Sequence, residues 1–459
     1  MNKNYDAIVI GAGQAGPSLA ARLTSENLKT AIIERNLFGG TCVNNGCIPT
    51  KTLVASARAA HMARRGDEFG VNISGDIRVD MKKVKARKDA VVQQSNQGVT
   101  GWMKNMQGLD VYEGHAQFEN SNVINVNGEQ LQADKIFINV GARARVPDMS
   151  GLSDIKYFTN SNIMDVDYLP EHLIIIGGSY IGLEFAQMYK RFGSEVTVVE
   201  MSDRLISRED QDVSETVQEI LENEGINIHV GAECISFEKR ANKIAVKVSC
   251  DDEMQESLGT HVLLAVGRVA NTHDLGLEKA GVKANKFGII EVDDELRTNI
   301  PGIWALGECN GKGAFTHTSY NDYEIVADNL FGTKTRRVND RIVCYGLFID
   351  PPLGRVGLTE QQICDSGKKA LIGKMPMSRI GRAKERGETQ GFMKVMIDAE
   401  NDQILGANIL GIGGDEVIHL LLDTMYAKKP YQLIKNAVHI HPTVAELIPT
   451  LLQDLQELN

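Results

Sequence analysis

The sequence predicts an α/β protein in which two units built on one plan are followed by a third unit of the α+β kind. In each of the first two units, a short β-branched strand leads into a glycine-rich turn and a helix, at Asp6–Leu23 and again at His172–Gly193. From about residue 337 the pattern changes to alternating strands followed by a helical run. Because 459 residues are too many for one hydrophobic core, two to four domains are expected.

The first strand, turn and helix read DAIVIGAGQAGPSLAARL. Gly11, Gly13 and Gly16 stand at the turn, and Glu34 ends the next strand about twenty residues on. Such glycines let the backbone approach a pyrophosphate at the helix N-terminus, and the acid accepts a ribose hydroxyl. The pattern predicts a Rossmann-like dinucleotide-binding domain, with glycines that serve only close packing as the alternative.

The second copy reads HLIIIGGSYIGLEFAQMYKRFG, and its middle glycine is replaced, which leaves Gly177, Ser179 and Gly182. Glu200 ends the following strand, EVTVVE, and a further glycine-containing strand end follows at HVLLAVGR. These neighbours favour a second Rossmann-like domain over glycines that serve packing alone.

The remaining segments complete a three-domain plan. The stretch after Val266 returns to strands and turns, as a second piece of the first domain would. FMKVMID and QILGANILG alternate like strands of an antiparallel sheet, and DEVIHLLLDTMYA follows with helical spacing. The expected domains are residues 1–148 with 271–336, residues 149–270, and residues 337–459.

Composition excludes several classes of partner. The formal charge is −11 and the isoelectric point is about 5.5, which argues against nucleic acid or an anionic membrane as a partner. No apolar run reaches the ~18 residues of a spanning helix, and Gln14 interrupts the apolar N-terminus, unlike a signal peptide. The basic run KKVKARK at 82–88 fits a solvated helix face. We expect a cytoplasmic protein.

Cys42 and Cys47 are the strongest chemical signal, in the stretch GGTCVNNGCIPTK. In a regular helix, residues five apart lie roughly 8–9 Å apart, beyond the ~6.8 Å that a disulfide allows between Cα atoms. If the two cysteines pair, the intervening VNNG is therefore not ordinary helix. Pro49 suits the first turn of a helix that begins nearby, where the helix dipole lowers the pKa of the Cys47 thiol.

Two alternatives stay open for this pair, namely packing cysteines and half of a metal site. The other five cysteines are expected to be small buried hydrophobes: Cys234, Cys250, Cys309, Cys344 and Cys364.

GGTCVNNGCIPTK resembles the redox-active motif of the pyridine nucleotide–disulfide oxidoreductases, FAD enzymes that include dihydrolipoamide dehydrogenase, glutathione reductase and mercuric reductase. The resemblance covers the whole chain. Besides the Gly11 fingerprint it includes GGSYIGLE (177–184), VGRVANT (266–272), PGIWALGE (301–308), PPLGRVGLTE (351–360) and HIHPTVAE (439–446). Within the family, GAFTHTSYNDYEIV (313–326) and DPPLGRVGLTE resemble a branch related to mercuric reductase and to the flavoproteins of reactive-chlorine resistance.

The resemblance implies two cofactors, FAD and either NADH or NADPH. The residues expected to bind FAD are Gly11, Gly13, Gly16, Glu34, Thr41, Lys51, Ala116, Gly141 and Glu308. Those expected to bind the nicotinamide nucleotide are Gly177, Tyr180, Ile181, Gly182, Glu200 and Gly267.

The resemblance also implies roles at the reacting centre. Cys47 is expected to be the flavin-side thiol, and Cys42 the outer thiol that exchanges with the acceptor. Lys51 and Glu184 resemble the ion pair beside the flavin N5, with a surface salt bridge as the alternative. Tyr180 matches an aromatic gate over the flavin, with a packed core tyrosine as the alternative.

His441 and Glu446 resemble the acid–base dyad that a partner subunit inserts at the disulfide. A histidine takes the proton of the exchanging thiol, and a carboxylate holds its tautomer. His439 is the alternative base, although the pairing of histidine with proline in the family favours His441. One subunit alone then has no complete site, which predicts an obligate homodimer through the C-terminal domain.

The chain departs from the family at two places. Glu308 stands where the family usually has an aspartate for the FAD ribityl chain, and its longer side chain needs a small local shift. The last residues, LLQDLQELN, contain no cysteine, whereas mercuric reductases usually carry a vicinal pair there, so whether the chain reduces Hg(II) efficiently stays open. Glu200 favours NADH because an acid repels a 2′-phosphate, although Arg204 and Arg208 follow closely enough to compensate.

The expected function is an NAD(P)H-dependent oxidoreductase of mercuric reductase-like type. Electrons pass from NAD(P)H through FAD and the Cys42–Cys47 disulfide to a small-molecule or metal-ion acceptor. A soft ion of the Hg(II) or Cu(II) type and a small disulfide both suit a thiol pair. Dihydrolipoamide dehydrogenase-type activity and a non-enzymatic flavoprotein redox sensor are the alternatives, and the acceptor, the preferred nucleotide and the physiological role stay open.

Overall fold

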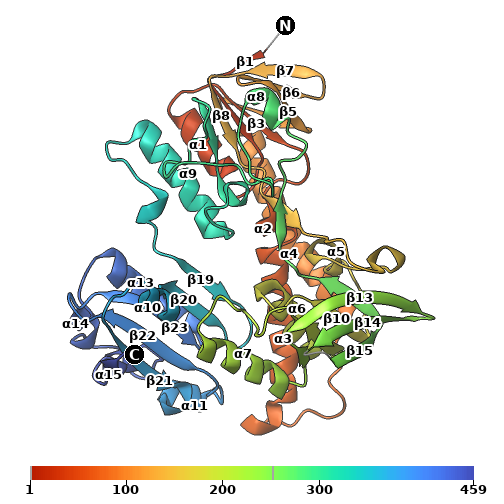
Figure 1. Ribbon diagram of the computed structural model, residues 1–459, viewed down its shortest axis with the longest axis vertical. Coiled ribbons are helices and arrows are strands. Elements are labelled where there is room, and N and C mark those ends of the chain that lie inside the picture. Colours follow the sequence, from red (N-terminus) through yellow and green to blue (C-terminus); the bar gives the residue numbers. More distant parts are fainter. Residues whose placement is uncertain (1–2, 251–252, 459) are drawn as a thin grey trace.

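The computed structural model describes residues 3–250 and 253–458. It consists of an N-terminal unit, a central unit and a C-terminal unit, each built on its own sheet (Figure 1). The α/β class with a C-terminal α+β unit agrees with the expectation from the sequence, although the residue boundaries of the domains stay a prediction.

The N-terminal unit contains a five-stranded parallel sheet in the order β18-β8-β2-β3-β4. Its edge strand β18 comes from far along the chain and pairs with β8, so the segment after the central unit completes the first sheet. The strands are β2 (Ala7–Ile10), β3 (Thr30–Glu34), β4 (Leu109–Glu113), β8 (Lys135–Ile138) and β18 (Ile303–Ala305).

A smaller sheet and several helices accompany this parallel sheet. The smaller sheet has the order β1-β7-β6-β5 and contains β1 (Lys3–Asn4), β5 (Ala116–Asn120), β6 (Val123–Val126) and β7 (Glu129–Gln132). The helices of the unit are α1 (Gly16–Ser25), α2 (Gly40–Asn44), α8 (Leu277–Ala280) and α9 (Thr316–Phe331), with 3₁₀ turns at Gly307–Asn310 and Val338–Asp340.

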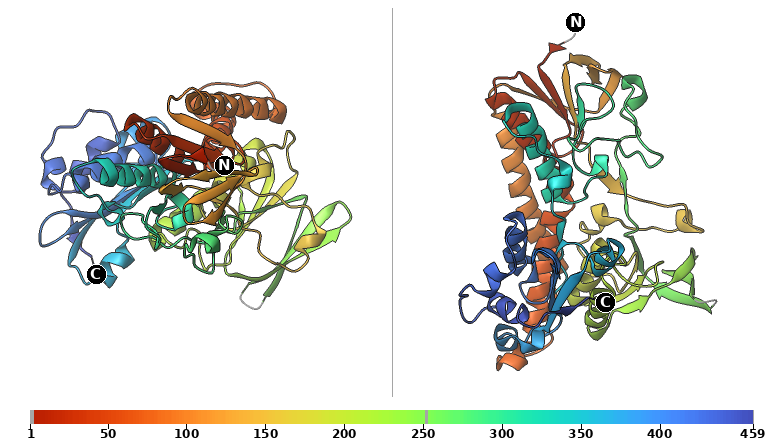
Figure 2. Two further views of the ribbon diagram at one scale, coloured as in Figure 1. Left: turned by 90° about the horizontal axis from the view of Figure 1, so that it is seen from above. Right: turned by 60° about the vertical axis from the view of Figure 1, so that its left-hand side comes forward.

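Two long helices, α3 (Cys47–Arg64) and α4 (Met81–Lys104), run along the length of the molecule from the N-terminal unit past the central one (Figure 2). A 3₁₀ turn at Gly66–Phe69 follows α3. The first residues of α4 contain the basic run, most of which is exposed or half-buried as expected, whereas Lys88 is buried.

The central unit repeats the parallel plan with the order β12-β11-β10-β16. Its strands are β10 (His172–Ile176), β11 (Glu195–Val199), β12 (Asn227–His229) and β16 (His261–Leu264), and its helices are α5 (Asn160–Ile163), α6 (Tyr180–Phe192) and α7 (Gln211–Asn223), with a 3₁₀ turn at Leu152–Asp154. An antiparallel sheet of β13 (Ala232–Arg240), β14 (Lys243–Cys250) and β15 (Glu253–Gly259) projects from it, and β9 (Ala142–Ala144) pairs with β17 (Arg268–Ala270) where the chain enters and leaves.

The C-terminal unit is an antiparallel sheet in the order β19-β20-β23-β22-β21-β24. Its strands are β19 (Cys344–Leu347), β20 (Leu353–Gly357), β21 (Ala370–Pro376), β22 (Phe392–Asp398), β23 (Ile404–Leu410) and β24 (Gln456–Glu457). The pairing of β22 with β23 confirms the antiparallel prediction. The helices are α10 (Glu360–Asp365), α11 (Gly381–Glu385), α12 (Gly414–Val417), α13 (His419–Tyr426), α14 (Gln432–Lys435) and α15 (Ile448–Leu451), with 3₁₀ turns at Met377–Arg379 and Ala445–Leu447.

One hydrophobic cluster joins the units. It contains Leu53 of α3, Leu183 of α6 and Leu347 of β19, all nearly or fully buried. Burial of such side chains stabilises each by about 1.5–3 kcal/mol, so the cluster fixes α3 and the C-terminal sheet against the central unit. Among the described helices, none combines the length and the apolar character needed to cross a membrane.

The expectation of buried cysteines outside the pair is wrong for two positions. Cys309 is buried and Cys344 is half-buried, but Cys234 and Cys364 are exposed. Burial depends on which face of an element a residue occupies, and a single cysteine carries no periodicity that reveals this. The side chain of Cys250 lies outside the described residues.

Candidate functional site

The two cysteines lie at the junction of two helices. Cys42 belongs to α2, and Cys47 is the first residue of α3. The helical path is broken by Asn45 (φ −147°, ψ 28°) and Gly46 (φ −136°, ψ −114°) alone, so the irregular segment is shorter than the VNNG predicted from the sequence. Both cysteines are free thiols, and the structure therefore represents the dithiol form of the pair.

The two thiols differ in their readiness to lose a proton. A hydrogen bond from the Cys42 thiol lowers the pKa of Cys47 to about 6; burial opposes this, and the Thr316 hydroxyl and the Lys51 charge add to it. The same bond and burial raise the pKa of Cys42. The Cys47 Sγ lies 3.2 Å from Thr316 Oγ1. Cys47 is therefore the thiolate of the pair, while Cys42 holds the proton.

Thr316 is a site residue that the sequence prediction missed. It is the first residue of α9 and stands in the quoted motif GAFTHTSYNDYEIV, but nothing in that motif pointed to a sulfur contact. Only the fold brings α9 beside the start of α3, because the two residues are 269 positions apart in the chain.

Lys51 lies one turn beyond Cys47 in α3 and pairs with Glu184 of α6. The distance from Lys51 Nζ to Glu184 Oε2 is 2.6 Å, and the Glu184 side chain is only 8% exposed. Glu184 Oε1 also accepts a hydrogen bond from the backbone N–H of Phe348 at 3.0 Å, and the Lys51 ammonium lies 4.3 Å from the centroid of the Phe348 ring. The pair is thus held between three units of the fold, which distinguishes it from an exposed surface salt bridge.

The first glycine turn has two glycines required by packing and one that leaves space. A Cβ on Gly11, where φ is +105°, would lie 2.3 Å from the carbonyl oxygen of Asn139, and one on Gly16 would lie 2.1 Å from that of Gly11. A Cβ on Gly13 would meet only Asn139, its side-chain Nδ2 at 3.4 Å and its carbonyl oxygen at 3.9 Å. Packing therefore explains Gly11 and Gly16, whereas Gly13 keeps the approach to the α1 N-terminus open, as a pyrophosphate needs.

The second glycine turn is built in the same way. A Cβ on Gly177, where φ is +114°, would lie 2.4 Å from the Ala265 carbonyl oxygen, and one on Gly182 would lie 2.0 Å from that of Gly177. Ser179 takes the middle position with an exposed side chain directly before α6. A serine therefore fits here without disturbing the turn.

The acids that follow the two turns are held identically. In each acid, one carboxylate oxygen accepts a hydrogen bond from a backbone N–H of the preceding glycine turn. The other oxygen accepts one from the backbone N–H of the residue two positions after the acid. Each oxygen keeps a lone pair for a ribose hydroxyl. The donors are Ala12 and Asn36 for Glu34, at 2.8 Å each, and Gly178 and Ser202 for Glu200, at 2.5 and 2.7 Å.

The other residues expected to bind cofactors differ in accessibility. Gly141 and Gly267 have φ of +62° and +100°, and a Cβ on either would meet nothing within 4 Å, so the space beside both is open. Thr41 in α2 and Ile181 in α6 are exposed, whereas Ala116 at the start of β5 is buried. Together with the two turns, these openings fit two dinucleotides.

Glu308 is engaged by a neighbour that the sequence prediction did not consider. Arg268 Nε donates to Glu308 Oε1 at 2.6 Å, and another guanidinium nitrogen donates to the Ala142 carbonyl oxygen at 2.6 Å. Arg268 thus links Glu308 to β9, and the second carboxylate oxygen of Glu308 makes no hydrogen bond within the described residues, as an acceptor for a ribityl hydroxyl requires.

Tyr180 is half-buried at the start of α6, and its hydroxyl donates to Glu209 Oε1 at 2.7 Å. Tyr345 of β19 donates to the same oxygen at 2.6 Å, and its ring packs edge-on to Tyr180 with centroids 5.6 Å apart. Burial raises the pKa of both tyrosines, so both hydroxyls stay protonated. Tyr180 is therefore fixed by a polar contact as well as by packing.

His441 and Glu446 form a hydrogen-bonded pair on the surface of the C-terminal unit. The His441 Nδ1 lies 2.9 Å from Glu446 Oε2, and its side chain is 81% exposed. The other ring nitrogen of His441 has no hydrogen-bond partner within residues 3–250 and 253–458. His439 contacts the Ala437 carbonyl oxygen instead of a carboxylate, so His441 is the better-oriented base.

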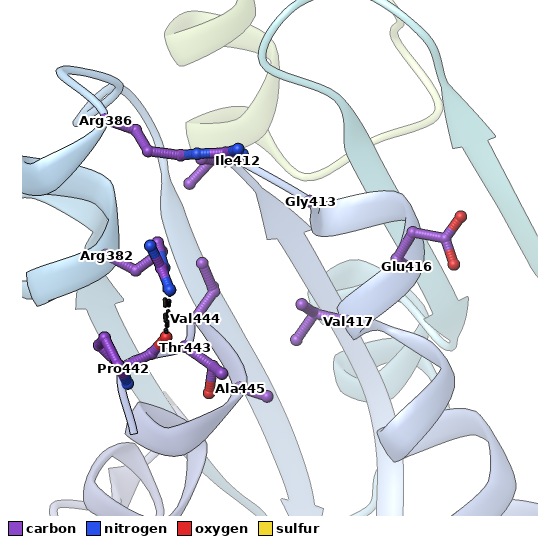
Figure 3. Close-up of a pocket in the computed structure, with 10 residues that line it drawn as sticks. All are labelled: Arg382, Arg386, Ile412, Gly413, Glu416, Val417, Pro442, Thr443, Val444 and Ala445. Carbon is purple, nitrogen blue, oxygen red and sulfur yellow. Dashed lines mark hydrogen bonds between the residues drawn. The ribbon is translucent and has the colours of Figure 1, made fainter. Parts of the chain in front are cut away.

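The loop that presents His441 is held by an arginine of α11. Two guanidinium nitrogens of Arg382 donate to the Pro442 carbonyl oxygen at 3.1 and 2.8 Å (Figure 3). The contact lies in a cavity of about 410 Å³ that Arg386 and Glu416 also line. Exposed apolar side chains precede this loop, with Ile440 81% and Val438 fully exposed. An apolar surface of this kind, beside a histidine that contacts no thiol within the part of the chain that the structure describes, is typical of a subunit interface.

Comparisons with known proteins find matches over nearly the whole chain. The family model of the pyridine nucleotide-disulphide oxidoreductases matches residues 5–322, and that of their dimerisation domain matches residues 343–452. The chain is 34% identical to the probable pyridine nucleotide-disulfide oxidoreductase RclA of Escherichia coli, covering 98% of this chain and 99% of that one.

Other relatives extend the range of activities among similar proteins. A dihydrolipoyl dehydrogenase of Bacillus subtilis is 30% identical over 98% of the chain and 97% of its own length. A mercuric reductase of Bacillus cereus is 32% identical over 91% of the chain and 66% of its own length. Among solved structures, a Cu(II) complex of the HOCl-induced flavoprotein disulfide reductase RclA from E. coli matches with a TM-score of 0.89 and 34% identity, covering 99% of both chains.

Proposed function

The chain belongs to the pyridine nucleotide-disulphide oxidoreductases, FAD-containing enzymes that depend on NAD(P)H, and on this premise we propose that Cys42 and Cys47 pass electrons to a thiol-reactive acceptor. The observation that carries the proposal is the asymmetry of the two thiols. Cys47 is the stabilised thiolate and Cys42 keeps its proton, which are the states that an inner and an outer thiol need.

The chain's own residues would hold the cofactors at defined places. The first glycine turn with Glu34 and the open side of Gly141 would hold FAD, and the second turn with Glu200 and the open side of Gly267 would hold the nicotinamide nucleotide. When bound, FAD supplies two-electron transfer between NAD(P)H and the disulfide form of the cysteine pair. The Lys51 ammonium, tied to Glu184, is the fixed positive charge beside Cys47 that favours its thiolate.

The dithiol would then reduce its acceptor by thiol chemistry. With a small disulfide, one thiolate attacks a sulfur, the second cysteine resolves the mixed disulfide, and two electrons with two protons leave as two product thiols. With a soft metal ion, the two sulfurs bind the ion and then form the disulfide. The two electrons released would reduce one Hg(II) to Hg(0) or two Cu(II) to two Cu(I), and the Cys42 proton would pass to a base. We favour the soft ion because RclA, a relative over almost the whole chain, has been solved as a Cu(II) complex.

A second candidate is dihydrolipoamide oxidation, in which the same pair accepts electrons from a dithiol. The observation that favours it is the similarity to several dihydrolipoyl dehydrogenases over nearly the full length of both chains. A flavoprotein redox sensor with incidental turnover is a further alternative. Free thiols that act with NAD(P)H fit a reducing compartment, so the proposed location is the cytoplasm.

The C-terminal unit is the family's dimerisation domain, which supports a homodimer. We propose that His441 and Glu446 serve the cysteines of the partner subunit. The support is the 81% exposure of His441, its carboxylate-held tautomer and the apolar side chains that precede it. The base would accept the proton of the exchanging Cys42 thiol.

NADH is the proposed nucleotide. Glu200 is fixed by two backbone N–H groups at the place of the ribose, where its charge repels a 2′-phosphate. Arg204 donates to the Ser207 carbonyl oxygen, so part of its guanidinium is already engaged. Arg208 is exposed and is the arginine left to receive a phosphate.

The test is steady-state NADH and NADPH oxidation by the FAD-loaded protein with Cu(II), Hg(II), small disulfides and lipoamide. Cys42→Ser and Cys47→Ser should lose acceptor turnover while they still bind FAD, and Cys364→Ser, an exposed cysteine elsewhere, is the control. Undiminished turnover in both variants of the pair would rule the proposal out. A sensor would turn over slowly with all acceptors and change its assembly on oxidation.

A further inference from the structure

The Glu209 carboxylate is a buried polar group for which the proposed reaction has no role. Glu209 precedes α7 and is 2% exposed. Its Oε1 accepts the hydroxyls of Tyr180 from the central unit and Tyr345 from the C-terminal unit, at 2.7 and 2.6 Å. Two donors on one oxygen of a buried carboxylate form a charge-assisted contact, which is stronger than a hydrogen bond between neutral groups.

The carboxylate itself cannot swing away. Its Oε2 is buried and makes no hydrogen bond within the described residues, and the nearest cation is Arg355 Nε at 3.9 Å, on a side chain that is 1% exposed. Arg355 is in turn 3.4 Å from Asp210, which also pairs with the fully buried Lys394 at 3.0 Å. Because the charges that surround Glu209 are fixed in the protein interior, Tyr180, which is half-buried, is the partner that is free to move.

The same network explains a group of three carboxylates that would otherwise suggest a cation site. Asp210, Asp212 and Glu360 have oxygens close together, and the ammonium group of Lys394 contacts all three. The Lys394 ammonium therefore supplies the positive charge that these three carboxylates need. Through Asp210, which also pairs with Arg355, the cluster helps to hold Arg355 beside Glu209.

Tyr180 stands between two parts of the proposed nucleotide site along α6. It follows the Gly177–Ser179 turn directly and precedes Glu184, the partner of Lys51, by four residues. A dinucleotide with its pyrophosphate at this turn and its nicotinamide at the Lys51–Glu184 pair would extend along the first turn of α6, where Tyr180 stands. This step rests on the proposed function.

We propose that Glu209 is a positioning residue that latches Tyr180 across the nicotinamide path until the nucleotide displaces the ring. Opening breaks the Tyr180–Glu209 hydrogen bond but leaves Tyr345 bonded to the same oxygen, so the buried carboxylate never loses its last donor. Tyr345 also keeps its place, because its ring stacks on Phe315 with centroids 5.4 Å apart. Tyr345 therefore stays hydrogen-bonded to Glu209, whereas the Tyr180 ring moves away from it.

The test compares binding of NAD⁺ with binding of ADP-ribose, which has the pyrophosphate and both riboses but no nicotinamide. Calorimetry on the oxidised, FAD-loaded protein gives both affinities without turnover. Tyr180→Phe keeps the ring and loses the hydroxyl, so NAD⁺ should bind roughly fivefold or more tightly because opening no longer breaks a hydrogen bond to a carboxylate. ADP-ribose affinity should stay unchanged.

Two further variants make the result decisive. Glu209→Gln weakens the same contact and should shift NAD⁺ affinity in the same direction, whereas Tyr189→Phe removes a buried hydroxyl from the same helix, bonded to the Ile163 carbonyl oxygen, and should change neither affinity. If Glu209→Gln does not fold, Tyr180→Phe alone decides. Equal NAD⁺ affinity in Tyr180→Phe and the unaltered protein, or an equal change for ADP-ribose, would overturn the latch. The proposed function fails separately, through the cysteine variants.

Discussion

At the residue scale, the chemistry of the cysteine pair depends on neighbours of Cys47 in the same short stretch and on one residue from a distant part of the chain. Thr316 and Lys51 act on the Cys47 sulfur together with Cys42. The cysteines and the lysine were evident in one short stretch of sequence, and the glycine turns with their acids were evident from spacing. Thr316, Glu209 and Tyr345 were not, because their partners are brought to them only by folding.

Thr316→Val should weaken the Cys47 thiolate. The pKa of Cys47, about 6 in the unaltered protein, should rise by about one pH unit, since a hydrogen bond to a charged group contributes about 1.5–3 kcal/mol. The thiolate fraction is high above the pKa and falls as the pH drops through it. The pH dependence of alkylation of the reduced enzyme measures the change, and Thr316→Ser, which keeps the hydroxyl, should restore the original profile. A profile unaltered in Thr316→Val would exclude a role for this hydroxyl.

At the element scale, the two nucleotide turns and the loop of His441 show how local geometry is fixed. The turns were predictable because their glycines are spaced as a strand, a turn and a helix require. The tie between α11 and the His441 loop was not predictable, since Arg382 and Pro442 are 60 positions apart and neither belongs to a repeated pattern. The exposed Cys234 shows the same limit, because it lies near a register shift of β13 that no spacing reveals.

Gly13→Ala and Gly16→Ala should behave differently although both replace a glycine of the first turn. A Cβ on Gly16 would lie 2.1 Å from the Gly11 carbonyl oxygen, so this variant should lose the turn and its stability. A Cβ on Gly13 has space in the protein and should leave folding intact, yet weaken FAD binding by roughly tenfold or more, because a pyrophosphate approaches there. Circular dichroism and FAD content after purification measure the two effects. Full FAD loading of Gly13→Ala would contradict the assignment.

Arg382→Met should slow reduction of the acceptor by roughly tenfold while reduction of the flavin by NADH stays at its original rate. The reason is that the Pro442 carbonyl oxygen loses both of its guanidinium donors, so the loop no longer holds His441 in one position. Stopped-flow measurement separates the two half-reactions. Arg386→Met is the matched control, because Arg386 lines the same cavity without bonding to the loop within the described residues. An equal decrease in the rate of acceptor reduction in both variants would mean that the hydrogen bonds from Arg382 to the Pro442 carbonyl oxygen are unimportant.

At the scale of the whole molecule, charged side chains fasten the units to one another. Asp350 of the C-terminal unit accepts hydrogen bonds from Arg191 of α6 at 2.6 Å and from Arg58 of α3. Burial acts to raise the pKa of Asp350, but Arg191 and Arg58 outweigh it, so the pKa lies below its usual range. The junction therefore depends on an ionised carboxylate.

Asp350→Asn should destabilise the fold by about 3 kcal/mol near neutral pH, since it leaves the buried Arg191 with one fewer acidic partner. The contribution of Asp350 is present above the unfolded pKa of about 3.9 and is lost as the pH falls through the lower folded value. The difference between variant and unaltered protein should shrink in acid accordingly. Urea unfolding at several pH values measures it, and a difference that is constant down to strongly acidic pH would contradict this account.

The proposal that His441 serves the cysteines of the partner subunit predicts complementation. Cys42→Ser and His441→Ala should each be inactive with the acceptor, but mixed dimers should regain about a quarter of the original turnover, because half of the dimers are mixed and one site in each is intact. Unfolding and refolding the two chains together, followed by an acceptor assay, measures this. No recovery, with mixed dimers confirmed by mass, would contradict a role of His441 at the cysteines of the partner subunit.

The fixed position of the Glu34 and Glu200 carboxylates affects the thermodynamics of binding. Each carboxylate is already immobilised by two backbone N–H groups before any nucleotide arrives. Ordering a mobile side chain when a ligand binds makes the free energy of binding less favourable by about 0.5–1.5 kcal/mol through lost conformational entropy. Here both side chains are ordered when the protein folds, so binding does not include this loss. If the two acids bind the ribose hydroxyls as proposed, each cofactor would meet a rigid acceptor. An aspartate at either position, too short to reach both amides, would then make binding entropically less favourable even with the charge retained.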